Sequence, residues 1–374
     1  MKNISSLDLV YYNLWKNIDK TIFLLIIFLF SLGLFFSFVS TSLIASDKLD
    51  TNNYFFFFKH LAYICLGLFV MIFFSSLSQK NLFKISIYLF FISLFFLLLV
   101  PILGTEVNGS KRWLKLFFLP RFQPIEILKP FTIILLATVL SSEKNFHIYY
   151  KYFLSFITIL PIALLLMIQP DIGQTLLVFL SWLTLVFISG ISLYIFIIFF
   201  GLSFIILLYS IFFIPRFEYI RNRIDSFFYP STGTHGGQSE KAIDAIVSGG
   251  FFGKGIGEGT LKNKIPDAHT DFIVSVISEE YGVVVIISLL IIFLFFIYNV
   301  FKKLYSEKNE KIKLILAGSI TLILAQTLIH LGVNISLFPT TGMTLPYLSY
   351  GGSSIIGVSI LSGIILNLTK RKVN

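Results

Sequence analysis

Long apolar stretches alternate with short polar connections along almost the whole chain. A bilayer core about 30 Å thick needs about 20 apolar residues for one helix to cross it. Ten stretches meet this requirement, and each is predicted to be a membrane-spanning helix. They are Thr21–Ile44, Tyr54–Ser75, Phe83–Leu103, Pro124–Ser141, Tyr152–Ile168, Ile172–Gly190, Leu193–Ile214, Phe272–Phe301, Ile312–Val333 and Tyr350–Leu368.

The polar connections between these stretches are short, with one exception. Residues 216–270 form a loop of about 55 residues between the seventh and eighth predicted spans, and glycines crowd its second half. Glycine permits positive φ and close approach of the backbone to a ligand, although a flexible loop has the same composition. The pattern therefore predicts an all-α polytopic membrane protein, with residues 1–374 as a single membrane domain and one large extracytoplasmic loop.

Composition agrees with this pattern. Of the 374 residues, 56% are hydrophobic and 13% are charged, whereas a soluble domain has roughly 25% charged residues. The formal net charge of +10 is expected to reflect topology and contact with anionic lipid rather than nucleic-acid binding. The single cysteine, Cys65, excludes an intrachain disulfide.

The distribution of lysine and arginine predicts the orientation. Ten spans place both termini on one side, and the short loops and tails of that side are rich in lysine, so both termini are predicted to be cytoplasmic. Two loops of the opposite side, 104–122 and 216–270, also carry several basic residues. The first of these loops is short and its charges oppose the topology signal. An anionic ligand on the outer face would explain why they are present.

The strip from Pro266 to Phe272 joins the large loop to the eighth predicted span. It places Asp267, His269 and Asp271 within five residues, where a polar loop meets the bilayer. A carboxylate or imidazole in a partly dry site can act as a general base. A helix starting near Thr270 would place Asp271 in its first turn, where the helix dipole favours the charged carboxylate. A simple helix cap and metal ligation by the three side chains are the alternatives.

Other polar groups lie within or beside the predicted spans. Glu279 and Glu280 fall inside the eighth span, where carboxylates are costly and usually face a cavity or a partner. Glu126 and Lys129 are one helical turn apart, and we interpret them as a structural ion pair. Asp171, in the sequence Gln169-Pro170-Asp171, is expected either to cap the following helix or to face the outer side.

Two further segments combine turn residues with groups that could bind a ligand. In Asn108–Trp113, Lys111 and Arg112 could bind phosphate while Trp113 either stacks on a sugar or anchors the chain at the bilayer surface. The ninth connection, Phe338–Ser354, has no net charge, two prolines and many hydroxyls. Such a loop suits a segment that lines a cavity at membrane depth, and its Gly351-Gly352 step would allow close packing of the last helix.

Taken in order, these strips resemble the SEDS family (shape, elongation, division and sporulation proteins), which includes FtsW, RodA and SpoVE. The resemblance extends over nearly the whole hydrophobic chain. The sequences of Ile265–Asp271 and Gly342–Pro346 are most similar to the FtsW branch. The chain departs from the family pattern at Ile125 and Gly237. These differences affect the expected loop geometry and not the assignment to the family.

The resemblance implies a peptidoglycan glycosyltransferase that polymerises lipid II on the outer face of the bacterial cytoplasmic membrane. It implies that Asp271 is the catalytic residue, acting as a general base. Candidate substrate-binding residues are Lys111, Arg112, Trp113, Gln123, Asp171, Arg221, Lys254, His269, Glu279, Glu280 and Ser349. No cofactor is assigned, although a divalent cation (Mg²⁺ or Mn²⁺) on the pyrophosphate could share the neutralisation of its charge.

The same resemblance implies partners and a location. A class B penicillin-binding protein, divisome membrane proteins, lipid II and undecaprenyl-pyrophosphate-linked glycan are the expected partners, and the division septum is the expected location. Three alternatives remain open: an elongation-type RodA polymerase, a lipid II flippase that makes no bond, and a non-catalytic scaffold.

Overall fold

The structure, a computed structural model, describes residues 17–41, 55–107, 110–115, 120–142, 148–214, 217–228, 236–261, 265 and 267–370. The predicted span ends at Ile44 and Tyr54, and the motif residues Asn108, Gly109 and Pro266, lie outside these ranges. The helices are α2 (Lys20–Thr41), α4 (Phe55–Ser76), α5 (Gln79–Leu103), α6 (Pro124–Leu140), α7 (Ile148–Ile168), α8 (Ile172–Ile188), α9 (Leu193–Phe213), α10 (Glu218–Phe228), α11 (Gly236–Gly249), α12 (Ile273–Tyr281), α13 (Val283–Ser306), α14 (Glu310–Asn334) and α15 (Gly352–Leu368).

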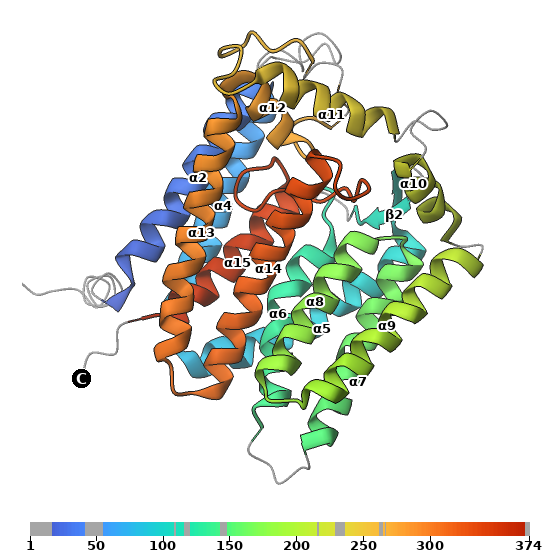
Figure 1. The fold of residues 1–374 in the computed structure, drawn as a ribbon. Helices are drawn as coiled ribbons and strands as arrows, with labels where there is room; N and C mark the ends of the chain where they lie inside the picture. The colour runs from blue at the N-terminus through green and yellow to red at the C-terminus, as the bar shows by residue number, and fades with distance from the viewer. Residues whose placement is uncertain are drawn as a thin grey trace, which may run out of the picture.

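The predicted all-α membrane fold is confirmed. Among the described residues, seven helices are long and apolar enough to cross a bilayer, and α8 and α15 are shorter apolar helices. In Figure 1 the long helices run roughly side by side, α10, α11 and strand β2 lie at one end, and the connection between α13 and α14 lies at the other end. The count of ten spans and the cytoplasmic side of the termini stay predictions.

The first outer loop contains a small β-hairpin. Strands β1 (Thr105–Val107) and β2 (Ser110–Trp113) pair antiparallel, with Glu106 opposite Lys111 and Val107 opposite Ser110. Because side chains alternate along a strand, Lys111 is exposed whereas its neighbour Arg112 turns partly inward. Of the two adjacent cations on this strand, the hairpin therefore turns Arg112 inward and leaves Lys111 exposed.

Helix α15 lies in the middle of the bundle and packs closely on α4. A methyl group added at Gly352 would lie about 2.5 Å from the ring of Tyr63, which confirms that this glycine allows close packing. Apart from its first residues, α15 is buried along almost its whole length. It forms part of the floor on which the outer loops rest.

The eighth predicted span, Phe272–Phe301, is wrong as a single helix. The chain breaks at Gly282, whose φ of 81° ends the nine-residue helix α12 before α13 begins at Val283. Only α13 has the length of a span. Glu279 and Glu280 therefore lie at the end of a short helix that precedes the span, and the prediction that they fall inside the spanning helix is wrong.

The large loop has its own secondary structure. Helices α10 and α11 occupy parts of it, and α11 packs on α12. Ser239, Ala242 and Ala245 form the buried face of α11, at the i, i+3, i+6 spacing of one helix side. The loop thus forms a structured layer over the outer end of the bundle.

The predicted ion pair between Glu126 and Lys129 is confirmed. The Lys129 Nζ lies 3.0 Å from Glu126 Oε2, and both side chains are buried in α6. Gln174 donates a hydrogen bond to Glu126 Oε1, and Lys129 donates another to Gln326 Oε1. Each charge thus has both an ionic and a hydrogen-bonded partner, as a buried pair requires.

Candidate active site

Two neighbouring cavities open at the end of the bundle where α10, α11 and the hairpin lie, and they share one wall. The first, of about 520 Å³, is lined by residues of α10, α11, the end of α14 and the loop before α15. The second, of about 460 Å³, extends from the hairpin to α4. Four residues line both cavities: Arg223, Asp267, Asp271 and Gly342.

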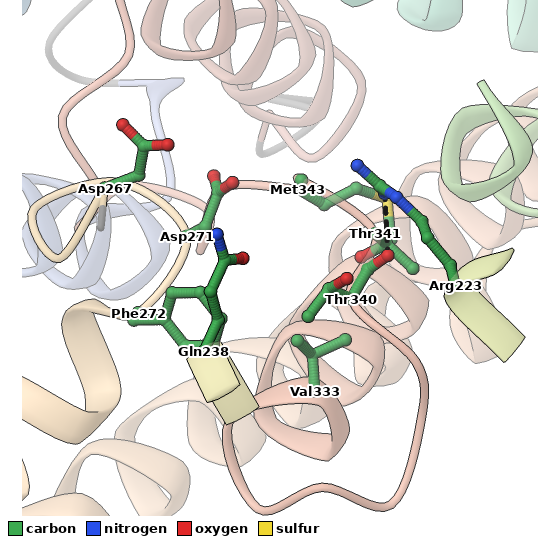
Figure 2. A pocket seen from close by; sticks show the side chains of 10 residues that line it. Arg223, Gln238, Asp267, Asp271, Phe272, Val333, Thr340, Thr341 and Met343 are labelled. Atoms are coloured by element: carbon green, nitrogen blue, oxygen red, sulfur yellow. Dashed lines mark hydrogen bonds between the residues drawn. The ribbon is translucent and has the colours of Figure 1, made fainter. Parts of the chain in front are cut away.

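Asp271 lies at the centre of this shared wall. Figure 2 shows its carboxylate beside Gln238, with Arg223, Thr340 and Thr341 across the first cavity. The residue belongs to a turn in which the amide of Asp271 donates to the carbonyl of Asp267, and α12 begins only at Ile273. The prediction that Asp271 occupies the first turn of the helix is therefore wrong.

Two side chains hold this turn in place. Asn334 donates from Nδ2 to the carbonyl of Asp271 over 3.1 Å and accepts at Oδ1 from the hydroxyl of Ser275. Ser349 donates to the carbonyl of Thr270 over 2.7 Å. Both anchors are buried, so the main chain on each side of the carboxylate is fixed to the bundle.

The surroundings of Asp271 change its acidity. Burial, together with the negative charge of Asp267, raises the pKa of Asp271 from 3.8 to about 7, against the opposing effect of Arg223 and Arg112. A helix dipole would have lowered this pKa. A carboxylate with a pKa near neutrality is suited to accept a proton and return it at physiological pH.

Arg112 reaches the second cavity from the hairpin. Its guanidinium lies 3.7 Å from Asp171 Oδ1 and also donates to the carbonyl of Pro170. Asp171 caps α8, as predicted, and accepts from Gln123 Nε2 over 2.9 Å. Asp171 is buried and does not line either cavity. It positions Arg112 and Gln123, which both line the second cavity together with Trp113.

The second cation of the site is Arg223, which we did not select from the sequence. It projects from α10, lines both cavities and donates to the carbonyl of Thr340 over 2.8 Å. Arg221, selected instead, lines neither cavity. The two arginines are two residues apart, about 200° around a helix, and only the structure shows which side of α10 meets the cavity.

The loop before α15 forms the rest of the shared wall. Gly342 has a φ of 72°, and a methyl group added there would lie 3.6 Å from Asp271 Oδ2 and 3.8 Å from Arg112 Nη1. Gln326 donates from Nε2 to the carbonyl of Thr344 over 2.9 Å, while its Oε1 accepts from Lys129. The buried ion pair of α6 thus orients the amide that fixes this loop.

Several predicted site residues lie away from the two cavities. Lys254 pairs with Glu279 at 3.7 Å in the glycine-rich turn, and Glu279 Oε1 accepts from the amide of Leu261. Ser349 acts on the main chain only, and His269 packs against the rings of Phe56 and Tyr350, where burial lowers its pKa. Lys111, Lys254, His269, Glu279, Glu280 and Ser349 line neither cavity.

The acidic groups also bear on metal binding. Over the part of the chain that the structure describes, no three His, Cys, Asp or Glu side chains are placed to hold a metal ion, so Asp267, His269 and Asp271 do not form the ligand set considered from the sequence. Asp267 and Asp271 line the cavities together. A divalent cation there would depend on oxygen atoms of a bound diphosphate for its other ligands.

Comparison with known proteins gives consistent matches. Residues 19–374 match the family described as cell cycle protein, FtsW/RodA/SpoVE. The chain is 30% identical to the probable peptidoglycan glycosyltransferase FtsW of Caulobacter vibrioides, covering 96% of this chain and 90% of that protein. It is 32% identical to the protein of the same name from Nitrosomonas europaea, covering 92% and 90%.

Two solved structures resemble the fold. A chain from a study of the structural coordination of polymerization and crosslinking by a peptidoglycan synthase complex superposes with a TM-score of 0.76 at 27% identity, covering 94% of this chain and 97% of that chain. The rod shape determining protein RodA of Thermus thermophilus superposes with a TM-score of 0.69 at 27% identity, covering 95% and 97%.

Proposed function

The chain belongs to the FtsW/RodA/SpoVE family of cell cycle proteins, and we propose that it is a peptidoglycan glycosyltransferase that joins lipid II units into glycan strands on the outer face of the cytoplasmic membrane. Its relatives of about 30% identity bear the name of that activity. Lipid II carries sugars on a polyprenyl diphosphate. A site for it needs a base, cations and access from the membrane.

The observation that carries the proposal is the placement of Asp271 between two cavities, opposite two arginines. Gly342 leaves the space between Asp271 and Arg112 open, because a methyl group there would touch both. Arg223 lines the same two cavities. A carboxylate that can hold or release a proton thus faces guanidinium groups that can bind a diphosphate.

The geometry supports an inverting displacement. Asp271 takes the proton from the 4-hydroxyl of an acceptor GlcNAc, and that oxygen forms a bond to C1 of the donor MurNAc. The bond between C1 and the phosphate oxygen breaks, and the electron pair leaves with undecaprenyl pyrophosphate. Arg112 and Arg223 stabilise the negative charge that develops on the leaving group.

The buried residues around the site keep these groups in position. Asp171 holds Arg112, and Asn334 and Ser349 hold the turn that carries Asp271. A general base contributes about 10²–10⁴-fold to the rate. Positioned cations contribute at least as much when charge develops in a shielded site.

A role in septal wall synthesis, with a class B penicillin-binding protein as partner and further divisome membrane proteins nearby, is the finer part of the proposal. The names of the relatives and the match to a chain studied within a peptidoglycan synthase complex support it. The elongation role is the alternative. Imaging a fluorescent fusion distinguishes them, because a septal enzyme concentrates at midcell and an elongation enzyme follows the side wall.

A flippase that makes no bond is supported less well. A polar path across the bilayer would need charged groups that face a common passage. Glu126 lines the second cavity, but Lys129 neutralises its charge, and Glu279 pairs with Lys254. A scaffold without catalysis would not need a carboxylate placed between two cavities and opposite two arginines.

The deciding experiment measures polymerisation of purified lipid II by the full-length protein in detergent, with and without a class B penicillin-binding protein. We expect polymer from the native chain and from a Glu240→Gln control on α11, and about 10²–10⁴-fold less from Asp271→Asn. In detergent there are no two membrane sides between which lipid II could be moved. Polymer formed there must therefore come from bond formation, which a flippase does not catalyse. Near-normal polymer from a folded Asp271→Asn protein would refute the general-base role.

A further inference from the structure

An exposed apolar turn lies between α11 and the rest of the outer layer. It comprises residues 250–256, which we call the aromatic turn. Phe251 is 75% exposed, Phe252 is 84% exposed and Ile256 is 65% exposed, and Val247 on the preceding helix is 73% exposed. Aromatic rings this open to solvent are unfavourable in water and usually mark an interaction surface.

The backbone of this turn explains its shape but not its side chains. The amides of Lys254 and Gly255 donate to the carbonyls of Glu279 and Glu280, over 2.9 and 3.0 Å. These carbonyls are at the C-terminal end of α12, where a helix leaves acceptors unsatisfied. Capping a helix in this way requires only main-chain atoms. It gives no reason for two phenylalanines at the outer side of the turn.

The position of the turn relative to α13 indicates what covers it. The amides of Val283 and Val284, which begin α13, donate to the carbonyls of Gly250 and Phe251. Helix α13 is long and apolar enough to span a bilayer, and Val284, Ile287 and Ile291 are exposed on it. The aromatic turn is therefore continuous with a lipid-facing helix at the point where that helix begins.

We propose that the aromatic turn is a membrane-surface anchor that inserts Phe251 and Phe252 into the outer leaflet at the end of α13. Phenylalanine is among the residues that form the apolar face of elements lying in the bilayer interface. The anchor is hydrogen-bonded to the end of α12, so it fixes the height of the helix that follows Asp271.

Electron paramagnetic resonance on the full-length protein in lipid nanodiscs tests the proposal. Because Cys65 is exposed, the labelled variants are made in a Cys65→Ser background. A nitroxide is attached at Phe252→Cys, with Ile291→Cys on the exposed side of α13 as the lipid reference and Glu240→Cys on α11 as the aqueous reference. Power saturation then compares collisions with oxygen, which dissolves in lipid, and with a water-soluble nickel complex.

We expect the ratio of oxygen to nickel collisions at position 252 to approach that at position 291 and to exceed that at position 240 several-fold. A ratio equal to that at position 240 would overturn the proposal. The proposal would also be overturned if the nickel complex reaches position 252 in the protein alone and loses access only when a class B penicillin-binding protein is added. The turn would then be a contact surface for that protein. The inference does not depend on the proposed activity, since the readout requires no substrate.

Discussion

The side-chain amide of Asn334 donates to the main-chain carbonyl of Asp271 over 3.1 Å. The same amide group donates to the carbonyl of His330, and its oxygen accepts from both the amide and the hydroxyl of Ser275. One buried side chain thus connects the last turn of α14 with Asp271, two residues before α12, and with the first turn of α12. The position of the carboxylate depends on this connection.

Replacing Asn334 with alanine is expected to lower kcat more than it changes KM. The turn loses its fixed position, and a shift of about 1 Å in a reacting group can lower a rate roughly 10²-fold. The measurement is steady-state polymerisation of lipid II. Asn299→Ala is the matched control, because Asn299 is an exposed asparagine whose amide donates to a carbonyl of its own helix. Equal losses for both variants would show that the position of Asn334 is unimportant.

The pH dependence of activity should report the pKa of Asp271. A general base works only when deprotonated, so kcat/KM should fall as the pH drops through about 7. Asp267→Asn removes a negative neighbour that raises this pKa, and the acid limb should move to lower pH. Arg223→Gln removes a positive neighbour, and the limb should move to higher pH. Shifts in the opposite directions, or none, would argue against Asp271 as the titrating group.

The raised pKa of Asp271 also predicts a stability effect. Its pKa is 3.8 in the unfolded chain and about 7 in the folded protein, so between these values the folded state binds the extra proton. The carboxylate therefore lowers the free energy of unfolding progressively as the pH rises from about 4 to 7. Asp271→Asn should have a higher Tm than the native chain at pH 8, and the difference should shrink at pH 5. A constant difference would contradict this.

The two arginines of α10 form a natural matched pair. Arg223→Gln should lower kcat/KM by roughly 10–10²-fold, because a hydrogen bond from a charged group contributes about 1.5–3 kcal/mol. Arg221→Gln should remain close to the native chain, since Arg221 lines neither cavity. Polymerisation kinetics with both variants at two salt concentrations check this. A larger loss for Arg221→Gln would indicate that α10 turns its other side to the substrate.

Gly342 provides a test of the space at the shared wall. Gly342→Ala places a methyl group in van der Waals contact with Asp271 and Arg112, which narrows the space between them, and should lower activity. Gly190 also has a positive φ, of 93°, but a methyl group there meets nothing within 4 Å. Gly190→Ala should therefore lower the free energy of unfolding by roughly 1–2 kcal/mol through backbone strain alone, which lowers Tm, and the variant should keep its activity. Comparable activity in the two variants would show that the space is not used.

The sequence predicts the long helices well because membrane spans depend on length and apolarity alone. The break at Gly282 was missed because a single glycine is common in membrane helices and the valines that follow it continue the apolar run. The adjacent pair Glu279 and Glu280, just before the glycine, was the available signal. It indicates that the spanning helix begins only after these two residues.

The candidate site was predicted only in part, because some of its residues belong to sequence motifs and others do not. Asp271, Arg112, Trp113 and Gln123 carry motifs in the sequence, and the structure brings them to the two cavities. Arg223 has no such motif, and its choice over Arg221 depends on the rotation of α10. Asp171 and Ser349 act behind the site because their partners are distant in sequence, which local patterns cannot reveal.

The break at Gly282 also has a consequence for biogenesis. An acidic residue such as aspartate at the centre of an inserting helix opposes insertion by about 2.5–3.5 kcal/mol. Because α13 begins at Val283, the segment that enters the bilayer contains no acidic residue and ends with lysines, among them Lys303. The translocation machinery can therefore accept α13 as a strong apolar signal. On the predicted topology, the short helix with its two glutamates then lies on the outer side together with Asp271.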